Sequence, residues 1–223
     1  MGGVLTHPAK VVASVTATQG GRFQMLRSFK GIMGMDVEAT DGSLGNAIRF
    51  FVDNEDFSLP LVMVGGGRAT TGELMVPTKL IEDMVWEDSM INVSAMRRSI
   101  FSSGSDVSRD TFGVFDALRL MGASVSTRGE DLGVVIDLMV ETDQPWNVKY
   151  LVVAVDGRDD REVLLNTEWI SKYNIEKKLV DLDVDRKDVN TCPECDLRER
   201  IRPEYEIRLS EHYNKPVHLA RFG

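Results

Sequence analysis

Two cysteines at positions 192 and 195 are the residues whose type and spacing are best suited to chemistry in this chain. The CxxC spacing lets two thiolates bind one zinc ion or exchange a disulfide. A structural zinc site usually needs four ligands, and the sequence has no other cysteine; only His212 and His218 could complete a site, if the C-terminal segment folds back. We therefore interpret Cys192 and Cys195 as part of a turn, with a zinc or thiol-redox site as the alternative.

Three aspartates at positions 181, 183 and 185 resemble the start of a calcium-binding loop. The rest of that loop is missing, because Arg186 stands where the loop needs glycine and Cys192 where it needs glutamate. The residues between the aspartates are apolar. The alternation therefore predicts a strand with one acidic, solvated face.

The segment 67–72 has the glycine spacing of a phosphate-binding loop. However, Glu73 stands where such a loop has the lysine that contacts the phosphates. A carboxylate at this position would repel the ligand, so we interpret the segment as a hairpin loop.

Catalysis by a serine or cysteine nucleophile usually needs a neighbouring histidine as base. The three histidines, His7, His212 and His218, all lie in the terminal segments of the chain. The sequence therefore predicts no catalytic residues, no cofactor, and a protein that is not an enzyme.

The elements that would position these residues repeat along the chain at an offset of 88 to 89 residues. The two copies match in their glycine and apolar positions. The matching segments are Gly34–Val37 with Gly122–Val125, Leu44-Gly45 with Leu132-Gly133, and Leu74–Thr78 with Val163–Thr167.

Both copies have the period-two pattern of strands. Leu132, Val134 and Ile136 begin one such apolar face, and turn residues such as Asp41-Gly42 and Arg128-Gly129 precede the longest strands. Five or so short strands in each copy predict a mainly β chain of two tandem small antiparallel β-barrels. Short helices are expected in the linker and the C-terminal tail.

The repeat also sets the expected domain boundaries. Residues 101–117 are rich in serine, which suits a linker, and Pro203–Tyr213 has the pattern of a helix. The predicted parts are an N-terminal tail (1–24), copy one (25–100), a linker (101–117), copy two (118–190) and a C-terminal extension (191–223).

Each copy resembles the PRC-barrel module, which is named for the cytoplasmic part of the photosynthetic reaction-centre H subunit. The resemblance rests on Gly34–Val37 followed by Asp41–Gly45, on Val52-Asp53, on Leu74–Pro77 with Ile81, on their counterparts in copy two, and on Tyr205–Tyr213. It implies a module that binds proteins or organises assemblies and has no shared catalytic residues. No transmembrane helix precedes copy one in this sequence, so a role in photosynthetic electron transfer does not follow.

Composition limits the partners. The 223 residues carry a net charge of −9, and the basic residues are scattered, so nucleic acid is a poor candidate. No apolar run reaches the ~18 residues of a membrane helix, so we expect no membrane insertion. Two closely spaced cysteines imply no disulfide framework, which suits a reducing cytoplasm.

The sequence therefore predicts a cytoplasmic scaffold or adaptor that binds another protein or a second copy of itself. Trp86, Trp146 and Trp169 are candidate interface anchors, because tryptophan is enriched at binding hot spots. The alternatives are the zinc or thiol-redox protein described above and a peripheral subunit of a membrane complex.

Overall fold

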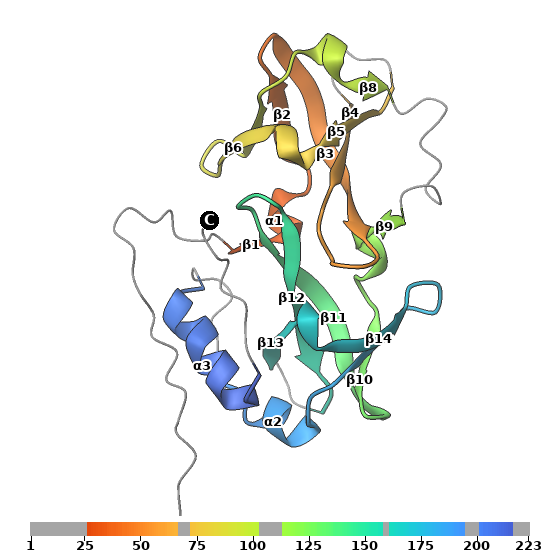
Figure 1. Cartoon of the computed structure of the whole chain (residues 1–223), viewed down its shortest axis with the longest axis vertical. Coiled ribbons are helices and arrows are strands. Elements are labelled where there is room, and N and C mark those ends of the chain that lie inside the picture. The colour runs from red at the N-terminus through yellow and green to blue at the C-terminus, as the bar shows by residue number, and fades with distance from the viewer. Residues whose placement is uncertain (1–25, 67–71, 103–112, 158–160, 195–200, 216–223) are drawn as a thin grey trace, which may run out of the picture.

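The computed structural model describes residues 26–66, 72–102, 113–157, 161–194 and 201–215. These residues form two mixed β-sheets, one above the other along the long axis of the molecule (Figure 1). The first sheet is built mainly from copy one and the second mainly from copy two, so the mainly β fold expected from the sequence is confirmed.

The first sheet has eight strands in the order β6-β7-β2-β3-β4-β5-β8, with β9 paired to β3. Its strands are β2 (Asp36–Ala39), β3 (Gly42–Asp53), β4 (Leu61–Gly66), β5 (Leu74–Pro77), β6 (Ile81–Val85), β7 (Met90–Val93), β8 (Phe101–Ser102) and β9 (Val114–Asp116).

The second sheet has seven strands in the order β13-β12-β11-β10-β15-β14, with β1 paired to β11. Its strands are β1 (Leu26–Ser28), β10 (Ser124–Thr127), β11 (Glu130–Glu141), β12 (Asn147–Val155), β13 (Glu162–Asn166), β14 (Ile170–Asn174) and β15 (Leu179–Leu182).

The described helices are short. They are the α-helices α1 (Phe29–Ile32), α2 (Arg186–Asn190) and α3 (Pro203–Tyr213), and the 3₁₀ helices η1 (Thr78–Leu80), η2 (Arg97–Ser99), η3 (Ala117–Arg119) and η4 (Thr167–Trp169). Among the described residues, no helix has the length and apolar character needed to cross a membrane.

The helix expected at the C-terminal end is confirmed as α3. Pro203 lies in its first turn, where the missing N–H breaks no helical hydrogen bond. Asn214 ends the helix in the left-handed conformation, with φ of 48°. In the predicted linker, η3 begins only at its last residue, Ala117.

The expectation of purely antiparallel pairing is wrong. β2 pairs in parallel with β7, and β10 pairs in parallel with β15. The physical reason is that the chain keeps its direction through the 3₁₀ helix of each copy, through η1 from β5 to β6 and through η4 from β13 to β14. The strand that follows, β7 or β15, then reverses and runs parallel to β2 or β10. Among the described residues each sheet is an open path of pairings, and no closed barrel is found.

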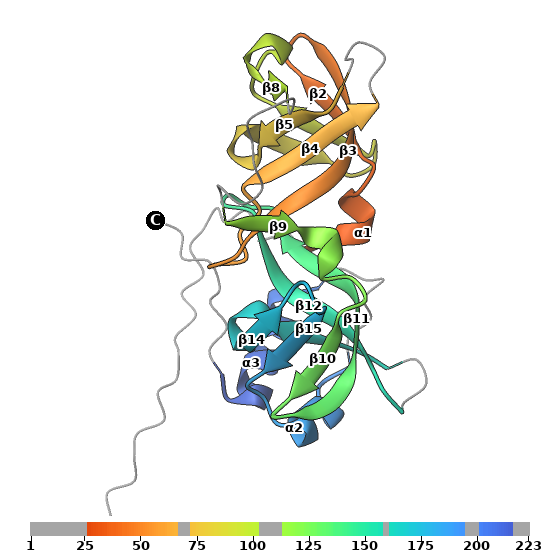
Figure 2. The ribbon, with the colours of Figure 1, turned by 90° about the vertical axis from the view of Figure 1, so that its right-hand side faces the viewer.

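Each copy gives one strand to the sheet of the other copy. β1 lies at the start of copy one, but it pairs with β11, with Leu26 opposite Glu141. β9 lies 88 residues further along, in the predicted linker, and pairs with β3, with Val114 opposite Asp53. Figure 2 shows β9 lying across the end of the upper sheet.

The two sheets share one hydrophobic core. Phe50 of β3 stacks on Trp146, which comes just before β12, with ring centroids 6.2 Å apart. A polar contact adds to this link, because the Ser28 hydroxyl donates to Asp137 of β11 at 2.6 Å. The two copies are therefore joined by a buried interface and two exchanged strands.

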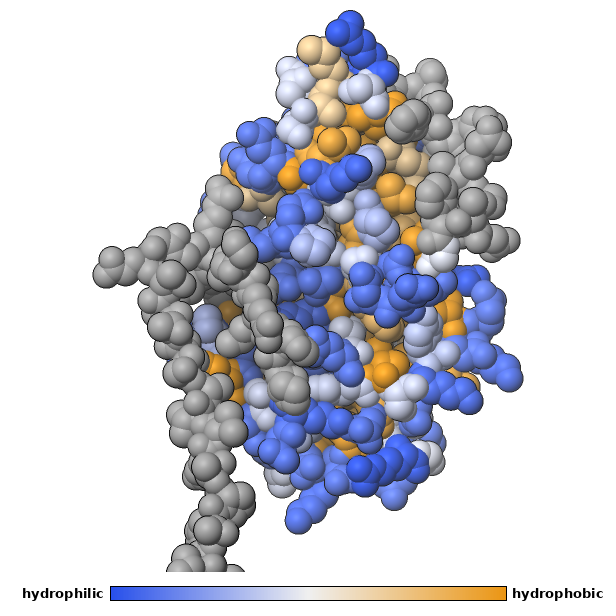
Figure 3. Space-filling model, viewed as in Figure 1, coloured by the Kyte–Doolittle hydropathy of each residue, from blue (hydrophilic) through white to orange (hydrophobic). Residues whose placement is uncertain are grey.

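On the face drawn in Figure 3, apolar residues gather over the first sheet, and hydrophilic residues predominate over the second. The second sheet is covered on one side by α3, as Figure 1 shows. Leu209 and Tyr205 of α3 are buried in this contact, and the Tyr213 ring lies 4.6 Å from that of Trp169.

Candidate functional site

Two loops meet at the junction of the copies, one before β4 and one before β12. The Leu59 N–H donates to the Trp146 carbonyl at 2.8 Å, and the Val148 N–H donates to the Phe57 carbonyl at 2.9 Å. Leu59 and Val148 are equivalent residues, 89 positions apart. The same hydrogen bond is therefore made twice across a local two-fold relationship.

A cavity of about 440 Å³ lies on the copy-one side of this junction and is mainly apolar. We call it the apolar cavity. Its apolar walls come from both copies and include Pro60, Leu61, Pro77, Val114, Pro145 and Trp146.

A second cavity, of about 320 Å³, lies on the copy-two side, and we call it the charged cavity. It shares Ser58, Gln144 and Pro145 with the apolar cavity. The two cavities are related by the repeat: where the apolar cavity has Pro60, Pro77 and Lys79, the charged cavity has Lys149, Asn166 and Glu168, each 89 residues later.

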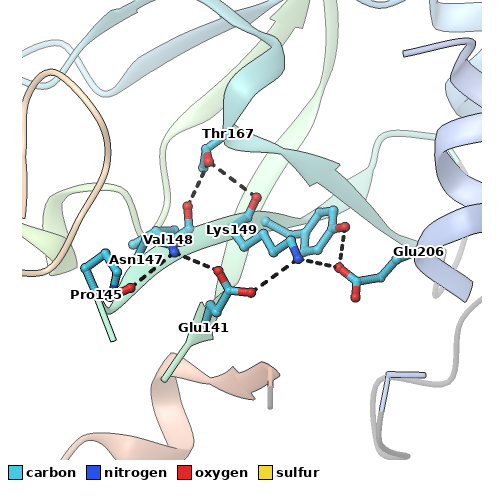
Figure 4. Close-up of polar contacts among 8 residues, drawn as sticks. Glu141, Pro145, Asn147, Val148, Lys149, Thr167 and Glu206 are labelled. Carbon is cyan, nitrogen blue, oxygen red and sulfur yellow. Dashed lines mark hydrogen bonds and ion pairs between the residues drawn. The ribbon is translucent and has the colours of Figure 1, made fainter. Parts of the chain in front are cut away.

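A buried charge cluster, drawn in Figure 4, adjoins the charged cavity, and two of its members, Glu141 and Lys149, line it. The Lys149 ammonium lies 3.3 Å from Glu141 and 2.8 Å from Glu206, and the three residues are at least 94% buried. Glu206 comes from α3, so the cluster ties this helix to β11 and β12. One ammonium faces two carboxylates, which leaves the cluster with a net negative charge.

Tyr150 and Asn147 complete the hydrogen bonding of the two carboxylates. The Tyr150 hydroxyl donates to Glu206 at 2.8 Å, and the Asn147 amide donates to Glu141 at 2.8 Å. Burial, together with the nearby Glu206 charge, raises the pKa of Tyr150 far above its ordinary value. This phenol therefore stays protonated and acts as a hydrogen-bond donor, not as a nucleophile.

Threonine hydroxyls fix the backbone under both cavities in the same way. Thr78 donates to the Leu59 carbonyl at 2.6 Å, and Thr167 donates to the Val148 carbonyl at 2.7 Å. Both threonines are buried and begin 3₁₀ helices. The two cavities are thus built on one repeated frame and differ in the side chains that line them.

The structure places Cys192 in a buried position after α2. Burial raises the pKa of its thiol, which disfavours the thiolate needed for metal binding or disulfide exchange. Cys195 and His218 lie outside the described residues. His212 Nε2 lies 2.7 Å from the Asp188 carbonyl. Within the described part of the chain, no group of three or more His, Cys, Asp or Glu side chains could hold a metal ion.

The three tryptophans differ in exposure. Trp146 and Trp169 are buried, and Trp146 also lines the apolar cavity. Trp86 is half-buried; the Arg27 guanidinium lies over its ring at 4.6 Å, and the ring packs beside Gly31 of α1. Of these three predicted interface anchors, Trp146 is the one that lies at the junction of the copies, and Trp86 is the most accessible.

The acidic alternation at the end of copy two does form a strand, β15, but it ends at Leu182. The two following aspartates are exposed and pair with basic residues: Asp183 with Lys215 at 2.9 Å, and Asp185 with Arg128 at 2.5 Å. The Lys215 ammonium lowers the pKa of Asp183. The possible phosphate-loop segment, 67–72, lies outside the described residues except for Gly72.

The sequence patterns did not reveal the charge cluster or the two cavities. One signal was present, because Lys149 interrupts the apolar run of β12. A lysine within a buried strand requires a nearby carboxylate. Its partner Glu206 lies in a different predicted part of the chain.

No protein-family model matches the chain, and no curated protein matches its sequence. What can be inferred about its function therefore rests on the geometry of the junction.

Proposed function

We propose that this chain is a non-catalytic, cytoplasmic adaptor made of two PRC-barrel-like modules, which binds another protein at the junction of the two copies. The observation that carries the proposal is the pair of repeat-related cavities that share Ser58, Gln144 and Pro145. An apolar hollow beside a charged one is the arrangement that protein interfaces use, with an apolar anchor at the centre and polar contacts around it.

The module assignment is supported by the shared order of elements. Strand, long strand, two further strands, 3₁₀ helix and hairpin follow one another in both copies. A barrel would require the two ends of each pairing path to meet, β6 with β8 and β13 with β14. An adaptor needs such rigid modules to hold its cavities in a fixed shape.

The non-catalytic part of the proposal is supported by the state of the buried nucleophile candidates. Burial raises the pKa of both the Tyr150 phenol and the Cys192 thiol, so both groups are protonated at neutral pH. A catalytic nucleophile would need the opposite shift.

Affinity capture from the soluble and membrane fractions of the host, at two salt concentrations, tests the adaptor. Val114 is half-buried and lines the apolar cavity, so Val114→Asp puts a charge into that cavity. The matched control is Leu179→Asp, which changes an apolar residue that is 49% exposed on β15. A partner retained by the wild type and the control but lost by Val114→Asp supports the proposal. Retention of the same proteins by all three forms, with both variants folded, contradicts it.

A further inference from the structure

We propose that the protein associates with itself by pairing the edge strand β6 of one molecule with the edge strand β14 of the next molecule. This contact goes beyond the adaptor function, because neither strand lines the two junction cavities. It is carried by two open strand edges, by the direction of their backbone groups, and by a reversal of charge between equivalent positions.

The two strands lie at the ends of their sheets. Within the described residues, β6 is the last strand at one end of the first sheet, and β14 is the last strand at one end of the second. The opposite ends offer less, because β13 is buried except for Glu162 and β8 has only two residues. Figure 1 shows β6 and β14 on opposite sides of the molecule, so each edge is left for another molecule.

The turn after β6 fixes which of its backbone groups point outward. The Ser89 N–H donates to the Trp86 carbonyl at 3.2 Å and closes the hairpin of β6 and β7. Hydrogen-bonded and non-hydrogen-bonded pairs alternate along an antiparallel ladder. Counting back from the turn, the backbone N–H and C=O groups of Asp83 and Val85 therefore point away from β7, towards the open edge.

The turn after β14 gives the same result. The Lys178 N–H donates to the Ile175 carbonyl at 3.3 Å, so the backbone groups of Lys172 and Asn174 point away from β15. Open space accompanies the strand, because a cleft of about 520 Å³ runs between residues 170–173 and the loop before β4. Each edge therefore presents two residues that can exchange backbone hydrogen bonds with an incoming strand.

Equivalent positions of the two hairpins carry opposite charges. Asp83 of β6 corresponds to Lys172 of β14, 89 residues later, and Asp88 in the first turn corresponds to Lys177 in the second. All four side chains are exposed, and none forms an ion pair within the described part of the chain. The Asn92 amide donates to Oδ1 of Asp83 at 2.6 Å, which leaves Oδ2 to meet a cation.

This reversal selects one pairing among three. Charges on edge strands commonly keep edges apart, because like charges directly across a strand pair repel each other. Two β6 edges would bring Asp83 residues together, and two β14 edges would bring Lys172 residues together. Only β6 against β14 places Asp83 opposite Lys172, where opposite charges attract. The contact joins two different surfaces, so it continues from molecule to molecule or closes a ring.

Sedimentation velocity of the full chain at low salt, over a range of concentrations, measures the association. Two five-residue strands form a small contact, so we expect a dissociation constant of roughly 0.1–1 mM that rises with added salt. Asp83→Lys and Lys172→Asp each place like charges across the contact, and each should weaken association about tenfold. Glu211→Lys is the matched control, because it makes the charge change of Asp83→Lys at an exposed position of α3 and should associate as the wild type does.

An equal mixture of the two variants gives the decisive result. Asp83→Lys carries a basic residue at this position of both edges, and Lys172→Asp carries an acidic one, so each mixed contact again joins opposite charges. We expect the mixture to recover the association that each variant lacks alone, which neither misfolding nor a change in net charge would produce. A wild type that stays monomeric at about 1 mM overturns the proposal. Variants that associate as the wild type does, or a mixture that recovers nothing, overturn it as well.

Discussion

Ser58 and Asn147 face each other in an isolated antiparallel bridge, and they are equivalent residues of the two copies. The local two-fold axis that relates the two copies therefore passes between these two residues. The exchanged strands β1 and β9 obey the same relationship, since each pairs with the end of the other copy's long strand. The molecule behaves as an internal dimer whose two halves have diverged in their cavities.

The exchanged strands predict that neither half is stable alone. A fragment ending at residue 112 lacks β9, and a fragment starting at residue 113 lacks β1, so the end of the long strand in each fragment loses one of its pairing partners. We expect each fragment alone to lack a cooperative thermal transition, and the two mixed to form a one-to-one complex. Calorimetry and size-exclusion chromatography would check this; two fragments that each unfold cooperatively would contradict it.

The charge cluster predicts unequal costs for its members. Lys149→Met leaves two buried carboxylates facing each other without a cation, and we expect it to lower the free energy of unfolding by about 3–5 kcal/mol. Glu206→Gln leaves one ammonium with one carboxylate and keeps an acceptor for Tyr150, so its cost should stay below about 2 kcal/mol.

Urea unfolding at neutral pH measures both costs. Lys172→Met is the control for Lys149→Met, because Lys172 is exposed on β14 and its loss should change stability by less than about 0.5 kcal/mol. A cost for Glu206→Gln equal to that of Lys149→Met would show that the cluster is not limited by its excess of negative charge.

The cluster also shows where prediction from sequence ends. The repeat, the alternating strands and α3 could be predicted, because periodicity and capping residues are local signals. The pairing of β1 with β11 could not, since a strand of three residues carries no periodicity. The contact between Tyr150 and Glu206 spans 56 positions and exists only because α3 docks on the second sheet. Lys149 in an apolar strand indicated a buried partner without identifying it.

Buried phenol and thiol groups predict a loss of stability at alkaline pH. Burial raises the pKa of Tyr213 above its ordinary value of 10.0 and that of Cys192 above 9.0. In the unfolded chain these groups ionise at their ordinary pKa, whereas in the folded chain they ionise only at a higher pH. The stabilisation is therefore complete below about pH 9 and is lost as the pH rises from the ordinary pKa of each group towards its folded pKa, by about 1.4 kcal/mol per pH unit within that window.

Tyr213→Phe removes one of these groups and keeps the ring against Trp169. The hydroxyl that it removes lies beside the Cys192 thiol and lowers the pKa of that thiol, so the variant also raises the pKa of Cys192 slightly. Its melting temperature should fall less steeply than that of the wild type between pH 9 and pH 11. Tyr173→Phe is the comparison: the Tyr173 hydroxyl is more accessible, so this variant should follow the wild-type slope more closely. Parallel slopes for the wild type and Tyr213→Phe would contradict the prediction.

Gly133 predicts a strong steric requirement at the start of β11, within the Leu-Gly pair that both copies share. A Cβ atom at this position would lie 1.9 Å from the backbone oxygen of Ala154 on β12, and that oxygen cannot move without breaking the sheet. We expect Gly133→Ala to destabilise the protein by about 3 kcal/mol or more. Gly129→Asn is the matched control, since the site has φ of 83° and open space around it, and asparagine tolerates this conformation at a cost of about 1 kcal/mol or less. Thermal unfolding of both variants decides the point, because equal melting temperatures would mean that β11 and β12 can separate at Gly133 to admit a side chain.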